Sequence, residues 1–122
     1  MGPSDILIKR AYEAAASSDG YRVLVDRLWP RGLTKQALPL NDWDKDLAPS
    51  TELRTWFGHD PQRWAEFQKR YREELSSPEQ RARLQELLKA AGSRALTLVY
   101  GAKDEQHTHA LVLQAKLKKL QG

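Results

Sequence analysis

The run of apolar residues from Ala95 to Tyr100, which ends directly at Gly101, constrains the fold more than any other feature. A run of this length that is apolar at nearly every position is typical of a strand buried on both faces, as in parallel sheets. A second strand is predicted at 22–26, and a shorter one opens at 6–8. Helical patterns separate these strands, which predicts an α/β fold with a small, mostly parallel sheet of about three to four strands packed with helices. We expect the 95–100 strand to be central and the 22–26 strand to lie beside it in parallel.

Helices are predicted from capping residues and from apolar residues that recur every three or four positions. Ser77, followed by Pro78 and by Gln80, has the pattern of a capping box at a helix start. Between 34 and 49 the pattern is ambiguous, because prolines limit any helix there. The expected helices are a short one between Ser50 and Gly58, one from Pro61 to Leu75, one from Pro78 to Ala91, and a last one from about Asp104 to Leu120.

Composition excludes several classes of protein. The 122 residues suit one domain, which we place at 5–120, and 40% hydrophobic with 30% charged residues indicates a folded chain. There is no apolar run near the length of a membrane span and no signal-peptide pattern, so we expect no membrane partner. Without cysteine the chain has no disulfide, thiolate metal site or cysteine nucleophile, which fits a cytoplasmic location. A net charge of +4 permits an anionic or nucleic-acid partner and requires neither.

The loop after the 22–26 strand is the first candidate site, because ligands in α/β sheets bind beyond the carboxyl ends of strands. It holds Arg27, Trp29, Arg31 and Gly32 within six residues. The two arginines offer forked donors for phosphate or carboxylate, and the glycine permits close backbone approach. The alternative is a solvated turn in which Trp29 plugs the core.

The loop after the 95–100 strand is the second candidate. Lys103 adds a positive charge where a strand-turn-helix would present free N–H groups. The alternative is a well-capped helix start with Asp104 at the N-cap, and both interpretations can hold together. A P-loop is excluded, because its pattern of glycines and lysine is absent.

Three histidines complete the candidate residues. His107 and His109 are two positions apart, about 200° around a helix, so they do not share a face and we predict no metal site. His109 is in phase with Leu113 and should point inward, where it serves as a base, a hydrogen-bond partner or a structural residue. His59 follows Gly58 and either covers a pocket or marks a helix–helix corner.

Three segments in this order resemble a bacterial family of small uncharacterised proteins, the YeaO-like family. They are RVLVDRLWPRGL at 22–33, DLAPSTELRTWFGHDPQRW at 46–64 and LVYGAKDEQHTHALVL at 98–113. The resemblance covers nearly the whole chain and implies no established activity. Some longer relatives carry cysteine where Tyr100 stands, so any cysteine chemistry of that branch is excluded here. The resemblance points to the same loops, together with Trp56 and Phe57.

We carry three hypotheses forward. The first is an anion-binding domain. A more specific form of this hypothesis is an enzyme that acts on a phosphorylated or nucleotide-like small molecule. The second is a nucleic-acid-binding or regulatory module, and the third is an interaction domain without a ligand. No cofactor or metal is expected, and the oligomeric state is not predicted. Candidate catalytic residues are His109, His59 and Asp104. Candidate ligand-binding residues are Arg27, Trp29, Arg31, Gly32, Lys103 and His107. We expect the side chains of Arg27, Arg31 and Lys103 to converge on one concave site.

Overall fold

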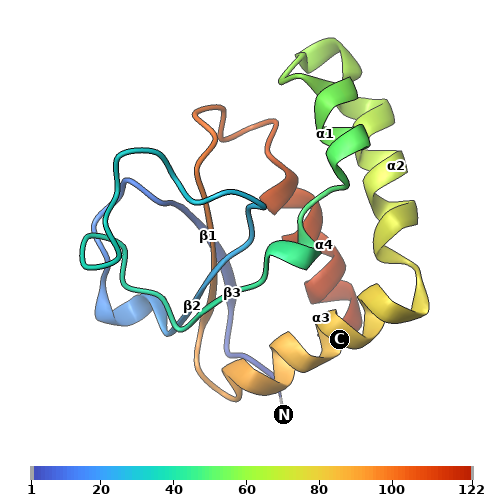
Figure 1. Ribbon diagram of the computed structural model, residues 1–122. Coiled ribbons are helices and arrows are strands. Elements are labelled where there is room, and N and C mark those ends of the chain that lie inside the picture. Colours follow the sequence, from blue (N-terminus) through green and yellow to red (C-terminus); the bar gives the residue numbers. More distant parts are fainter. Residues whose placement is uncertain (1, 122) are drawn as a thin grey trace.

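A computed structural model describes residues 2–121 and contains one parallel four-stranded sheet in the order β1-β4-β2-β3 (Figure 1). The strands are β1 (Ile6–Arg10), β2 (Tyr21–Leu24), β3 (Asp42–Trp43) and β4 (Leu96–Tyr100). The helices are α1 (Thr51–Phe57), α2 (Trp64–Leu75), α3 (Pro78–Ala91) and α4 (His109–Gln121), with 3-10 turns η1 (Ser17–Asp19), η2 (Lys45–Leu47) and η3 (Pro61–Arg63). The predicted α/β fold is confirmed.

β4 is a central strand, as its apolar sequence predicts. Leu98 lies opposite Ile8 of β1 on one side and opposite Val23 of β2 on the other. All five residues of β4 are buried. A strand with neighbours on both edges and cover on both faces favours apolar side chains, and its one polar residue, Thr97, is buried with its hydroxyl hydrogen-bonded to Asp19 O.

The two faces of the sheet are covered by different structures. The four helices pack on one face, while the loops around residues 11–20 and 25–41 lie on the other (Figure 1). Alternate strand residues follow this division, because successive side chains point to opposite faces. Val23 and Val25 belong to the helix-side core, whereas Leu24 joins Val99 in a smaller cluster under the loops.

The helix caps explain how α1 is positioned. Ser50 Oγ accepts a hydrogen bond from Leu53 N at 3.1 Å, as the sequence predicts. Glu74 of α2 also accepts from Ser50, with Oε2 at 2.6 Å from Oγ and Oε1 at 2.9 Å from N. The start of α1 is therefore fixed to α2 by a carboxylate that holds both donors of the cap.

The predicted capping box at α3 is wrong in one half. Ser77 Oγ accepts from Gln80 N at 3.2 Å, but the Gln80 side chain donates to the carbonyl of Asp46 at 2.8 Å instead of accepting from the cap. The η2 turn brings that carbonyl within reach, so a tertiary hydrogen bond replaces the local one. The ambiguous segment 34–49 contains this turn and the two-residue edge strand β3.

The predicted start of the last helix is also wrong, because α4 begins at His109 rather than near Asp104. Asp104 Oδ1 accepts from the backbone of Gln106 and His107 at 3.0 and 3.2 Å, which closes a turn of its own. Thr108 takes the place before the first helical residue. Its hydroxyl accepts from the N–H two positions on at 3.3 Å.

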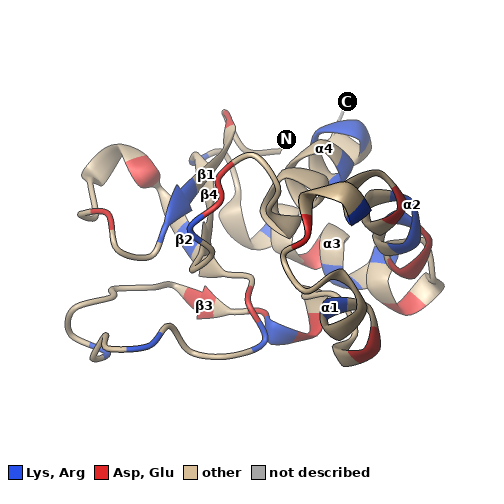
Figure 2. Ribbon diagram, turned by 90° about the horizontal axis from the view of Figure 1, so that it is seen from above, with Lys and Arg blue, Asp and Glu red and all other residues tan. Residues whose placement is uncertain are grey.

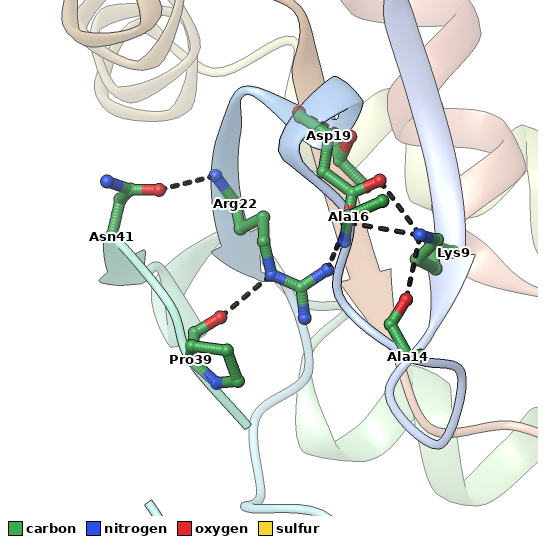
Figure 3. A network of polar contacts seen from close by, with 8 residues as sticks. Lys9, Ala14, Ala16, Asp19, Arg22, Pro39 and Asn41 are labelled. Atoms are coloured by element: carbon green, nitrogen blue, oxygen red, sulfur yellow. Dashed lines mark hydrogen bonds and ion pairs between the residues drawn. The ribbon is translucent and has the colours of Figure 1, made fainter. Parts of the chain in front are cut away.

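A buried carboxylate, Asp19, ties the loop after β1 to β2 (Figure 3). Its side chain accepts from Lys9 Nζ at 2.8 Å, Arg22 Nη1 at 2.6 Å and Ala16 N at 3.0 Å. Its carbonyl accepts from Thr97 Oγ1 of β4 at 2.7 Å. Burial by itself raises the pKa of Asp19, but the hydrogen bonds from its three donors outweigh burial and hold that pKa below its usual value.

Candidate functional site

A cavity of about 490 Å³ opens at the carboxyl ends of β2 and β4. Its walls come from residues 26–31 after β2, residues 101–102 and 107–109 around the loop before α4, and the α1–α2 corner. Tyr12, which follows β1, completes the lining. This is the edge at which ligands bind in open α/β sheets, and the sequence places both candidate loops there.

Asp26 joins the two strand exits that form the floor of the cavity. Val25 N donates to Val99 O at 3.0 Å and continues the pairing of β2 with β4 beyond the strand. The next residue, Asp26, accepts from Gly101 N through Oδ2 at 2.9 Å. A Cβ at position 101 would lie 3.1 Å from that oxygen, so glycine permits this close approach.

His109, the first residue of α4, points inward as predicted and contacts the same floor. Its Nε2 lies 3.0 Å from the carbonyl oxygen of Val25 and 3.3 Å from Asp26 Oδ1. A carbonyl only accepts, so Nε2 carries a proton, and a neutral His109 has its lone pair on Nδ1. Because that proton is directed at the carbonyl, Asp26 Oδ1 has no hydrogen bond among the described residues.

Three arginines line the cavity, and Asp26 is its single acidic residue. Arg27 donates through Nη2 to the carbonyls of Ala48 and Pro49 at 3.3 and 3.1 Å, while its buried Nε has no partner within residues 2–121. Arg31 and Arg54 supply the other two guanidinium groups. In the described part of the chain none of the three forms an ion pair within 4.0 Å.

The other two histidines also face this cavity. His107 Nδ1 lies 2.7 Å from Asp104 Oδ2, and this hydrogen bond is the main cause of an Asp104 pKa below its ordinary value. His59 is exposed and has a φ of 58°, a left-handed conformation that residues with a Cβ seldom adopt. It follows Gly58, whose φ is 54°, so two consecutive left-handed residues turn the chain from α1 towards α2.

The structure brings most of the predicted site residues together. Six of them line the cavity: Arg27, Trp29, Arg31, His59, His107 and His109. Gly32, Lys103 and Asp104 are not among its lining residues within 2–121, and the side chain of Lys103 is exposed. The predicted convergence of three cations therefore holds for the two arginines and not for the lysine.

Trp29 lies both at the cavity and against the smaller hydrophobic cluster under the loops. Its Nε1 donates to Leu33 O at 2.6 Å, and its ring meets Trp43 edge-on at a centroid distance of 5.5 Å. It thus belongs to the loop-side core while one side lines the cavity.

The sequence interpretation missed Arg54 and Tyr12. Arg54 lies one turn before Phe57 and Gly58 on α1, and that spacing is the signal that places it on the cavity side. Tyr12 has no comparable signal, because it follows β1 in an irregular loop.

Neither a metal-binding cluster nor a membrane-spanning helix is present within residues 2–121. Within residues 2–121 no group of three or more His, Cys, Asp or Glu side chains is arranged to hold a metal ion. None of the helices in that range is both long and apolar enough to span a bilayer.

The fold and the cavity define a small parallel α/β protein with an arginine-lined site at its strand ends. The chain belongs to the family described as the inactive DUF488-N3 subclade, whose model matches residues 5–121. It is 47% identical to the uncharacterized protein YeaO of Escherichia coli (strain K12) over 95% of this chain and 99% of that protein. It is 44% identical to the uncharacterized protein Rv3073c of Mycobacterium tuberculosis (strain ATCC 25618 / H37Rv), covering 88% and 89% of the two chains. These matches confirm the predicted family, and no solved structure matches at a significant level.

Proposed function

We propose that this protein binds a small anion in the cavity at the carboxyl ends of β2 and β4. The observation that carries the proposal is the set of three cavity arginines that form no ion pair within residues 2–121, where Asp26 is the one acidic residue of the lining. Cations gathered in this way repel one another, and a bound anion relieves that repulsion. Arginine also matches the oxygens of phosphate and carboxylate with paired donors.

The distribution of charge favours a cavity ligand over a nucleic acid. A nucleic-acid surface requires basic residues spread along a stripe. Lys and Arg segments of α2 are instead interleaved with Asp and Glu (Figure 2). Those basic groups are partly neutralised, as by the 3.0 Å ion pair of Arg70 with Glu66, whereas the cavity arginines are not.

We propose that the cavity binds an anion, and we do not propose that the protein catalyses a reaction. The family description carries the word "inactive", which favours a binding role without turnover. In this proposal the cavity arginines and His59 donate to the anion, while His109 Nε2 and His107 Nδ1 keep their hydrogen bonds to Val25 O and Asp104 Oδ2. The catalytic roles of His109, His59 and Asp104 stay predictions.

The test is a thermal melt in phosphate and in chloride at equal ionic strength. Phosphate at about a hundredfold over its dissociation constant should add roughly 2.7 kcal/mol of stability, or several degrees in Tm. Chloride should add much less, because screening is not selective. Arg31→Ala should abolish the phosphate-specific shift.

Arg81→Ala is the matched control, because it removes an exposed arginine of α3 outside the cavity. It should keep the full phosphate shift. Equal shifts in Tm in both salts, or a phosphate shift that depends on Arg81 and not on Arg31, would show that the cavity does not bind the anion.

A further inference from the structure

Two exposed apolar side chains lie at the same cavity as the arginines. Leu28 and Tyr12 are the large hydrophobic residues that the described chain leaves exposed, at 61% and 47%. Both line the cavity. A single exposed hydrophobic residue needs no explanation, but two at one ligand-sized hollow indicate a surface that becomes covered.

The structure holds the Tyr12 side chain and the residues on either side of Leu28 in place. The Tyr12 hydroxyl donates to the carbonyl of Arg31 at 2.9 Å, and the Arg10 guanidinium lies 5.2 Å from its ring centre. Leu28 lies between Arg27 and Trp29, whose side chains are both fixed by hydrogen bonds. Arg27 donates to two backbone carbonyls, and Trp29 donates to the carbonyl of Leu33. An apolar surface that is already ordered loses little conformational freedom when a ligand covers it.

The size of the cavity agrees with a ligand larger than an inorganic ion. Cavities of about 300–1,000 Å³ hold drug-sized molecules, and this one has about 490 Å³. Its walls also carry apolar groups from Phe57, Pro49 and Ala48. An oxyanion alone would occupy the arginines and leave Leu28 and Tyr12 in contact with water.

We propose that the ligand is an organic phosphate with an apolar, preferably aromatic, body. Its phosphate binds the cavity arginines, and its body covers Leu28 and Tyr12. This inference rests on the proposed anion-binding function and adds the chemical class of the ligand. The inference follows from two features of one cavity: arginines that form no ion pair within residues 2–121, and the exposed apolar side chains of Leu28 and Tyr12.

The test compares phenyl phosphate with methyl phosphate by isothermal titration calorimetry. The two probes present the same phosphate monoester and differ in the body alone. Phenyl phosphate should bind about tenfold more tightly, because the ring removes apolar surface from water on both sides of the contact. Leu28→Ser should reduce this preference by about threefold and leave methyl phosphate binding unchanged.

Leu28→Met is the matched control, because it keeps an apolar side chain of similar volume and should retain the preference. Arg31→Ala should weaken both probes together. Equal binding of the two probes to the native protein, or a preference that Leu28→Ser leaves intact, would overturn the inference about the body while the anion site stands. If neither probe nor inorganic phosphate binds, the proposed function fails, and this inference fails with it.

Discussion

Replacing Asp19 by asparagine tests how the loop-side network holds the sheet together. Asp19 is 3% exposed and bonds two cations, of which Arg22 is 6% exposed. Asp19→Asn keeps the shape but removes the negative charge, so Arg22 stays buried without a carboxylate. Breaking one partner of a buried ion pair costs about 3–5 kcal/mol. We expect a loss of that size in the free energy of unfolding, and a fall in Tm of roughly 10 °C or more.

The assay is urea denaturation of the native protein and the variant at neutral pH, with Tm as a second readout. Glu13→Gln is the control, because Glu13 is an exposed carboxylate in the same loop and should change stability by less than about 0.5 kcal/mol. A loss below about 1 kcal/mol for Asp19→Asn, at an unchanged m value, would refute the argument.

The same variant has a defined pH dependence. The folded pKa of Asp19 lies below its ordinary value, so its stabilising contribution is fully present above about pH 4 and is lost as the pH falls through the folded pKa. The stability difference between the native protein and Asp19→Asn should therefore shrink below about pH 4. A difference that stays constant into acid would contradict the assigned direction of the shift.

Two further predictions concern other parts of the molecule. Burial, followed by the charge of Asp42, raises the pKa of Asp44 to about 6, so the free energy of unfolding should fall as the pH rises from about 4 to about 6. Asp44→Asn should therefore stabilise the protein near pH 7 by up to roughly 2 kcal/mol but not near pH 3. Equal effects in denaturation curves at both pH values would contradict this. Gly20→Ala should lower the free energy of unfolding by roughly 3 kcal/mol or more in the same assay. The φ of Gly20 is 65°, and the new Cβ would lie 2.2 Å from the Ala95 carbonyl oxygen. A variant as stable as the native protein would contradict this.

The sheet was predictable because its signals are local and strong. A continuous apolar run such as 96–100 requires cover on both faces, and that requirement already places β4 in the centre. The edge strand β3 was not predictable, because two residues give no periodicity and their pairing with β2 depends on the path of a long loop. The start of α4 was misplaced because aspartate favours an isolated turn as readily as a helix cap, and Asp104 makes the turn.

The site was predictable in outline. Because β2 and β4 are parallel neighbours, the loops that follow them open on one edge, and this brings Arg27 and Arg31 towards His109. The contact of His109 with the floor joins residues more than eighty positions apart, and no local pattern encodes it. Lys103 was assigned to the site by the same strand-exit argument, but its side chain is exposed and does not line the cavity.

The most direct test of the account is where an anion binds. Crystals equilibrated with selenate report the ion through the anomalous diffraction of selenium. If the cavity binds the anion, a selenium peak should lie inside it, with oxygens at about 3 Å from guanidinium nitrogens of Arg27, Arg31 or Arg54. Peaks confined to exposed lysines such as Lys118 and Lys119 of α4, or an empty cavity at a saturating concentration, would contradict binding in the cavity.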